Sequence, residues 1–151
     1  MPSSEESRVL IDTYAWVEYF RGTEEGKLAR EFIESDRQVM TPTIALAELS
    51  DKYRRSGKRD VWEGERRHMV EVLSAIVPLS PDSADEAGAI KTEMRREKPD
   101  FPLADGMILA IARERGAKVL TGDRHIRDLP EAISLKKPPG SAASSPAGDG
   151  D

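Results

Sequence analysis

Short aliphatic runs alternate along the chain with longer segments whose apolar residues recur at helical spacing. The run "RVLI" predicts a buried strand, and Trp16, Tyr19 and Phe20 then mark one face of a helix that Gly22 ends. The same alternation continues to the end of the apolar sequence. It predicts strands at 8–11, 37–42, 76–80, 117–121 and 132–135, and helices at 13–22, 24–35, 43–57, 60–75, 81–98 and 102–115.

This order of elements favours an α/β fold, in which helices cover both faces of a parallel sheet. In such folds the ligand cleft lies beyond the carboxyl ends of the strands. Asp12 and Asp123 each follow a predicted strand directly. We therefore expect two carboxylates at the same edge of the sheet.

Two helical carboxylates are candidates to join them. Asp105 shares an apolar helical stripe with Ile108 and Leu109, where a charged residue is unusual. Glu48 follows an uncharged segment, "TPTIALA", early in its own helix. Both helices begin near the sheet, so both side chains are predicted to lean toward the same edge.

Four clustered carboxylates repel one another. Two ionised groups about 5 Å apart cost roughly 3 kcal/mol at an effective dielectric constant of 20. A divalent cation removes that cost, and oxygen ligands suit Mg²⁺ or Mn²⁺. The absence of cysteine and the presence of only two histidines give little support to zinc. An acidic pocket of this kind is typical of phosphodiester hydrolysis, in which a metal activates water.

Each acid also has an ordinary structural interpretation. Asp12 is suited to capping a helix, Asp123 to a turn, and Glu48 to an ion pair with Lys52 four residues later. Asp105 has no comparable explanation. The agreement of four positions on one sheet edge favours a functional cluster over four separate structural roles.

The composition indicates one compact domain of 151 residues. The net charge of −5 is uneven: residues 52–68 hold seven Lys/Arg against three Asp/Glu, and residues 91–98 hold four against two. These segments are either solvated helix faces or phosphate-contacting edges. The lack of cysteine, of a secretory signal and of a long apolar run predicts a cytoplasmic protein with no membrane segment.

Both ends of the chain are polar. From Lys136 onward no apolar residue is larger than alanine or proline, which predicts a disordered tail at 136–151. We expect a flexible N-terminus at 1–7 and one folded domain at 8–135.

Three segments, "VLIDTYAWVEYF", "TPTIALAELSDKY" and "FPLADGMILAIARERGAKVLTGDRHI", resemble the successive motifs of PIN-domain nucleases, and more narrowly of VapC-type toxins from toxin–antitoxin pairs. The resemblance covers residues 8–135. It implies a three-layer α/β/α sandwich around a mainly parallel sheet. It also implies Mg²⁺- or Mn²⁺-dependent cleavage of RNA, a homodimer, and a cognate antitoxin as partner.

The resemblance assigns residues to this site. It implies that the metal-binding and catalytic acids are Asp12, Glu48, Asp105 and Asp123, and that the supporting hydroxyls are Thr13 and Thr121. For phosphate contacts we single out five arginines: Arg54, Arg55, Arg59, Arg95 and Arg96. A fifth acid, Asp128, is a doubtful addition. We interpret His68 and His125 as surface or packing residues, and Trp16, Tyr19 and Phe20 as core or a dimer face.

Two other functions are compatible with such a fold. A PIN-fold module with a silent site would bind RNA or serve as a scaffold without cleaving it. A phosphotransfer domain of the receiver type would need an acidic pair near the first strand. Apolar residues fill the three positions before Asp12, which argues against the receiver.

Overall fold

The computed structural model describes residues 6–136 and contains a five-stranded sheet in the order β3-β2-β1-β4-β5. Every neighbouring pair is parallel; at the centre Leu10 pairs with Met40 on one side and Val119 on the other. The predicted α/β fold with a parallel sheet is confirmed. The strands are β1 Arg8–Ile11, β2 Gln38–Pro42, β3 Ala75–Val77, β4 Lys118–Thr121 and β5 Ala132–Ser134.

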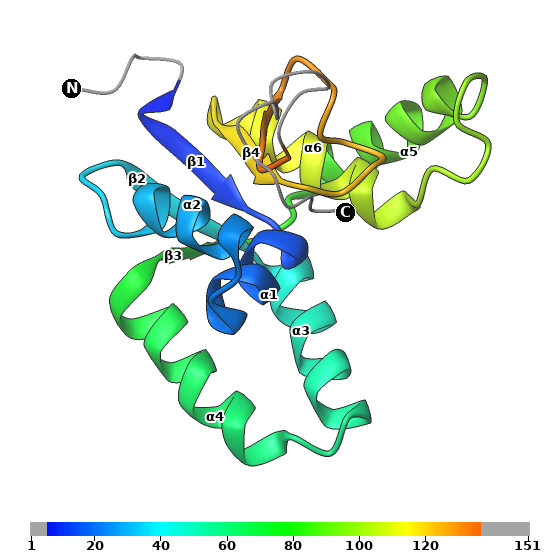
Figure 1. Cartoon of the computed structure of the whole chain (residues 1–151). Coiled ribbons are helices and arrows are strands. Elements are labelled where there is room, and N and C mark those ends of the chain that lie inside the picture. Colours follow the sequence, from blue (N-terminus) through cyan, green and yellow to red (C-terminus); the bar gives the residue numbers. More distant parts are fainter. Residues whose placement is uncertain (1–5, 137–151) are drawn as a thin grey trace, which may run out of the picture.

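Helices cover both faces of this sheet, as Figure 1 shows. Successive residues of a strand point to opposite faces. Leu10 accordingly packs in one core cluster with α5 and α6, whereas Val9 and Ile11 pack in a second cluster with α1, α2, α3 and α4. The helices are α1 Thr13–Arg21, α2 Glu24–Ile33, α3 Thr43–Arg55, α4 Arg59–His68, α5 Pro81–Met94 and α6 Leu103–Arg115.

Close contact between helices depends on two glycines. A Cβ at Gly26 would lie 1.9 Å from the carbonyl oxygen of Glu18, and one at Gly106 would lie 2.9 Å from that of Ala87. At these two positions the backbone of α2 therefore lies in direct contact with that of α1, and the backbone of α6 with that of α5. Gly106 directly follows Asp105, so this contact holds the first turn of α6, which carries Asp105, against α5.

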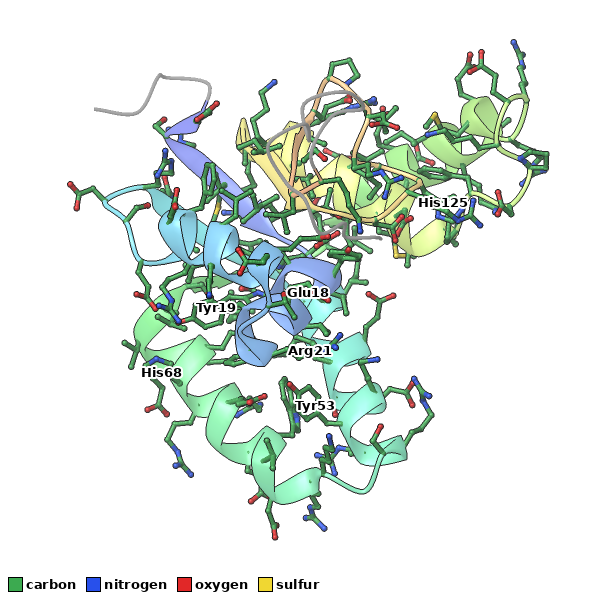
Figure 2. The ribbon with its side chains drawn as sticks, viewed as in Figure 1. Glu18, Tyr19, Arg21, Tyr53, His68 and His125 are labelled. Atoms are coloured by element: carbon green, nitrogen blue, oxygen red, sulfur yellow. The ribbon has the colours of Figure 1, made fainter. Side chains whose placement is uncertain are left out.

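Helices α3 and α4 extend beyond the sheet as an antiparallel pair (Figure 1). Tyr53 projects from α3 toward α4 (Figure 2), where its ring centroid lies 5.3 Å from that of Trp62. Trp16 is fully buried, as expected of a core residue, and its indole N–H donates to Thr41. Tyr19 packs edge-on against it.

Three elements end more than two residues before their predicted bounds. Strand β3 ends at Val77 because Pro78 has no N–H to continue the ladder. The helix expected at 60–75 divides at His68, where α4 passes into a π-helical turn, η2 Met69–Leu73. The helix expected at 81–98 ends at Met94, and the following turn places Phe101 in the core.

The two chain ends expected to be flexible lie largely outside the described residues. The N-terminal prediction covers residues 1–7, of which only Glu6 and Ser7 are described, and the tail prediction covers 136–151, of which only Lys136 is described. The Nζ of Lys136 lies 2.8 Å from Oε2 of Glu25 on α2. Within residues 6–136, none of the helices is both long enough and apolar enough to cross a membrane.

Candidate active site

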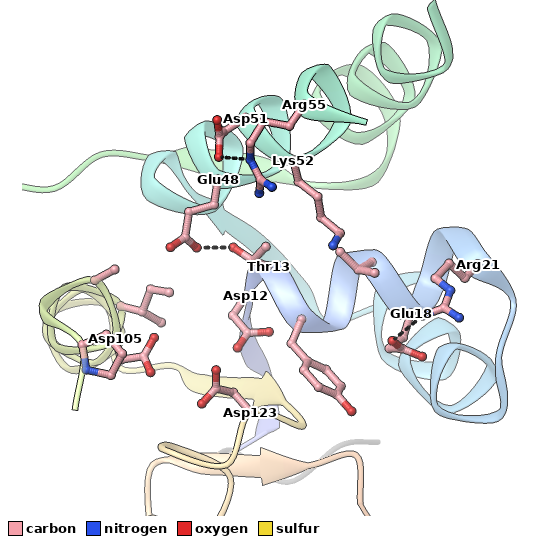
Figure 3. A pocket seen from close by; sticks show the side chains of 15 residues that line it. Asp12, Thr13, Glu18, Arg21, Glu48, Asp51, Lys52, Arg55, Asp105 and Asp123 are labelled. Carbon is pink, nitrogen blue, oxygen red and sulfur yellow. Dashed lines mark hydrogen bonds and ion pairs between the residues drawn. The ribbon is translucent and has the colours of Figure 1, made fainter. Parts of the chain in front are cut away.

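A pocket of about 590 Å³ lies beyond the ends of β1 and β4, between α1, the middle and end of α3 and the beginning of α6 (Figure 3). Its lining includes all four acids singled out from the sequence: Asp12, Glu48, Asp105 and Asp123. The structure thus brings together carboxylates that are up to 111 positions apart in the sequence. Their roles in metal binding and catalysis stay predictions.

Asp12 is the most deeply buried of these acids, with 3% of its surface exposed. It caps α1, and its Oδ1 accepts a hydrogen bond of 2.9 Å from the N–H of Ala15. Burial raises the pKa of Asp12 from 3.8 to about 7, although the hydroxyl of Thr121 and the Ala15 amide both favour the charged form. The structural interpretation as a helix cap is therefore correct, and it does not account for the full burial of a charge.

Asp105 projects from the first turn of α6 with only 13% of its side chain exposed. Its Oδ2 is buried and has no hydrogen-bond partner among the described residues. Burial raises the pKa of Asp105 to about 7, and the charges of Asp123 and Asp12 add to the effect. An unpartnered buried carboxylate oxygen is costly unless something outside the protein satisfies it.

Asp123 is fixed by the turn that follows β4. Its N–H donates to the hydroxyl of Thr121, and its Oδ1 accepts from the backbone N–H of His125 at 2.7 Å. Thr121 is fully buried and contacts both Asp12 and Asp123, so it ties the two strand-end acids together. The hydroxyl of Thr13 instead donates to Glu48 Oε1 at 2.5 Å. Glu48 makes no ion pair with Lys52 among the described residues.

His125 differs from its sequence interpretation. It does pack, with its ring edge-on to Phe101, but its Nδ1 also lies 3.2 Å from Asp123 Oδ1 and 3.7 Å from Asp105 Oδ2. The side chain belongs to the acidic site and not to the outer surface. Its position two residues after Asp123, in a turn that returns toward the strand end, is the sequence signal that could have indicated this.

The five arginines expected to contact phosphate do not gather. Arg55 lines the pocket and pairs with Asp51, whereas Arg54 bonds to Ser50 on its own helix. Arg59, Arg95 and Arg96 lie outside the pocket lining. Two further cations line the pocket that the sequence analysis did not single out: Lys52, four residues after Glu48 on α3, and Arg21 at the end of α1.

The residues present suit a divalent cation. Asp105, Asp123 and His125 each offer a ligand atom, and these atoms lie within 4.8 Å of one another. Asp12 adds a buried carboxylate whose pKa is raised in part by its acidic neighbours. A donor set of several carboxylate oxygens and one imidazole fits Mg²⁺ or Mn²⁺ and supplies the partner that the Asp105 oxygen lacks.

Fold and site together define an α/β protein with a cluster of acids, able to hold a metal ion, at the carboxyl edge of a parallel sheet. A protein-family model described as the PIN domain matches residues 9–132. The chain therefore belongs to the PIN-domain family. The three-layer α/β/α arrangement predicted from the resemblance is confirmed.

Several solved structures share the fold. A toxin–antitoxin complex from Klebsiella pneumoniae has a TM-score of 0.66 at 22% identity, over 85% of this chain and 98% of that chain. VapBC2 from Rickettsia felis, bound to promoter DNA, has a TM-score of 0.68 at 17% identity, over 84% of this chain and 96% of that chain. VapC20 from Mycobacterium tuberculosis, described as a sarcin–ricin loop cleaving toxin, has a TM-score of 0.62 at 17% identity, over 77% of this chain and 90% of that chain. Comparison with curated proteins gave no match.

Proposed function

We propose that this protein is a metal-dependent endoribonuclease and the toxin of a toxin–antitoxin pair. The observation that carries the proposal is the burial of Asp12 and Asp105 in one pocket, where each has a pKa of about 7 and the Asp105 Oδ2 has no partner among the described residues. Burying several acids together is unfavourable unless a ligand of opposite charge compensates them. Membership of the PIN-domain family supports nuclease chemistry at such a site.

In this proposal Asp12, Asp105 and Asp123 hold the metal, and Glu48 either joins them or orients the attacking water. A bound Mg²⁺ or Mn²⁺ would supply an activated water and stabilise charge on the leaving oxygen. With pKa values of about 7, Asp12 and Asp105 are each about half protonated near neutral pH when no cation is present, and a bound cation would favour the release of these protons. Thr13 orients the carboxylate of Glu48 through its hydroxyl.

The charge arrangement around the pocket suits a phosphodiester chain. The acids lie at the sheet edge, while Lys52 and Arg55 approach from α3 and Arg21 from α1 (Figure 3). Cations that line the same pocket as the acids attract the phosphates of a nucleic acid and would hold the scissile phosphate next to the acids. The similarity to a toxin described as cleaving the sarcin–ricin loop supports RNA as the substrate.

The remaining parts of the proposal concern partners and location. Structures of toxin–antitoxin complexes are among those that share this fold, which supports a cognate antitoxin as partner. We propose a homodimer in the cytoplasm, in line with the resemblance to VapC-type toxins and with the cysteine-free sequence.

A cleavage assay on mixed cellular RNA tests the proposal. The full chain is incubated with RNA in Mg²⁺, in Mn²⁺ or in EDTA, beside Asp105→Asn and the matched control Asp128→Asn. Asp128 is exposed and lies outside the pocket lining. We expect metal-dependent fragments from the wild type and from Asp128→Asn, and a loss of at least about a thousandfold in Asp105→Asn.

The silent-module alternative gives a different result. A protein that retains RNA in saturating Mn²⁺ and never cuts it has the fold without the activity. Equal cleavage by Asp105→Asn and the wild type would remove Asp105 from the mechanism.

A further inference from the structure

The position of His125 extends the metal site beyond its acids. We propose that His125 is a metal ligand through Nδ1 and that it gives the site a preference for Mn²⁺ over Mg²⁺. The inference rests on the proposed metal site and concerns its composition and selectivity. Neither the four-acid pattern in the sequence nor the family match assigns this residue a role.

Distances place the imidazole within reach of the same cation as the acids. Nδ1 lies 3.2 Å from Asp123 Oδ1 and 3.7 Å from Asp105 Oδ2. All three ligand atoms lie within 4.8 Å of one another, and both distances from Nδ1 are shorter than the roughly 4.2 Å that two metal–ligand bonds of about 2.1 Å span across one ion. Only 12% of the His125 side chain is exposed, so water competes poorly for this position.

Several contacts fix the ring in this orientation. The buried ring of Phe101 meets it edge-on, with the centroids 6.1 Å apart and the planes at 89°. The backbone carbonyl of His125 accepts from Lys98 Nζ at 2.9 Å. On the far side of the ring, Nε2 is buried and makes no hydrogen bond among the described residues, although Asp100 Oδ2 lies 3.3 Å away. The segment joining α5 to α6 thus positions the histidine that follows β4.

The distribution of protons on the ring explains why a cation suits Nδ1. Both ring nitrogens face carboxylate oxygens, yet a neutral imidazole carries one N–H. Without a cation, an N–H on Nδ1 can donate to Asp123 Oδ1 at 3.2 Å, which leaves the buried Nε2 without a hydrogen bond among the described residues. A cation bound at Nδ1 would take the place of that proton, and the N–H would then lie on Nε2, 3.3 Å from Asp100 Oδ2. A carboxylate on the outer nitrogen is also the usual arrangement around a metal-binding histidine, because it fixes the tautomer.

The preference for Mn²⁺ over Mg²⁺ comes from the imidazole nitrogen of His125. Mg²⁺ favours oxygen ligands and keeps several waters, whereas first-row transition metals accept imidazole readily. Replacing one oxygen donor by an imidazole therefore strengthens Mn²⁺ binding relative to Mg²⁺. The acids alone would distinguish these two ions weakly.

Electron spin-echo envelope modulation of bound Mn²⁺ tests the ligand directly, since a coordinated imidazole nitrogen produces a ¹⁴N signal. The chain has two histidines, and His68 on α4 lies far from His125 (Figure 2). We expect the ¹⁴N signal in the wild type and in His68→Gln, and its loss in His125→Gln. Labelling the wild type with ¹⁵N-histidine should replace the ¹⁴N pattern by a ¹⁵N pattern without any substitution.

Titration of both ions provides the second measurement. We expect His125→Gln to lose at least about tenfold in Mn²⁺ affinity and to change Mg²⁺ affinity by less than about twofold. Mn²⁺ that binds the wild type with no histidine nitrogen signal would overturn the inference and leave the proposed nuclease intact. A wild type that binds neither ion would instead overturn the metal site itself, and both proposals with it.

Discussion

Replacement of Asp12 by asparagine should stabilise the metal-free protein while it destroys the site. Asparagine has nearly the same shape, is an equally good helix cap, and can accept the hydrogen bond from Ala15 that Asp12 accepts. It lacks the charge that the folded protein buries at 3% exposure. In the wild type the hydroxyl of Thr121 hydrogen-bonds to the Asp12 carboxylate, and in the variant the asparagine amide can donate to that hydroxyl instead.

The size of the effect follows from the pKa. Burial, the largest cause, raises the pKa of Asp12 from 3.8 to about 7. Since a tenfold change in an acid dissociation constant corresponds to about 1.4 kcal/mol, ionised Asp12 costs the fold at most about 4 kcal/mol. Repulsion by the neighbouring acids forms part of this cost, so we expect a gain of about 2–4 kcal/mol in Asp12→Asn at pH 8.

The sign of the pH dependence is fixed by the same values. Near pH 4, Asp12 is protonated in the folded protein and about half ionised in the unfolded chain, so the two proteins should differ by less than about 1 kcal/mol. Between about pH 4 and pH 7 the unfolded chain gives up this proton while the folded protein retains it, so the stability of the wild type falls as the pH rises. Above pH 7 the difference stays constant.

Urea unfolding at pH 4, 6 and 8 in EDTA measures these differences, and thermal unfolding should show a midpoint roughly 5–15 °C higher for the variant at pH 8. Mn²⁺ at a hundred times its dissociation constant should add about 3 kcal/mol to the wild type and nothing to the variant. A variant less stable than the wild type at pH 8 in EDTA, or a difference independent of pH, would refute the reasoning.

Three further substitutions test other parts of the site. Asp105→Asn should also raise metal-free stability at pH 8, by about 2–3 kcal/mol, because burial raises the pKa of this acid to about 7 as well; urea unfolding at pH 5 and pH 8 checks it. Gly122→Ala should lose about 1–3 kcal/mol, measured by urea unfolding, since its Cβ would lie 2.4 Å from Cε1 of Tyr14; unchanged stability would mean that the ring moves freely. Lys52→Glu combined with Arg55→Glu should weaken RNA binding to catalytically inactive protein at least tenfold at low salt, with smaller losses at high salt, and a salt-independent loss would contradict a phosphate contact.

The sequence predicts the strand-end acids well because their positions depend on topology alone. Once β1 and β4 are parallel, Asp12 and Asp123 must lie at the same edge of the sheet. The burial of Asp105 can also be predicted from the sequence, because the apolar residues on the same face of α6 pack against α5 and the sheet. These inferences need only the period of each element and the direction of each strand.

Other features depend on packing that no local pattern encodes. His125 reaches the site because the turn after β4 folds back on Asp123 and because Phe101 supports its ring. The basic residues of the pocket are different, because Lys52 and Arg55 lie four and seven residues after Glu48 on one face of α3, whereas Arg54 lies off that face and does not line the pocket. The π-helical turn after His68 likewise interrupts a helix whose apolar periodicity continues through it.

An anomalous difference map from a crystal soaked in Mn²⁺ tests the central claim most directly. The account predicts a peak in the pocket, within bonding distance of carboxylate oxygens of Asp12, Asp105 or Asp123, that disappears in Asp105→Asn. A soaked wild-type crystal with Mn²⁺ bound only elsewhere, and with these carboxylates still facing one another without an ion, would contradict it.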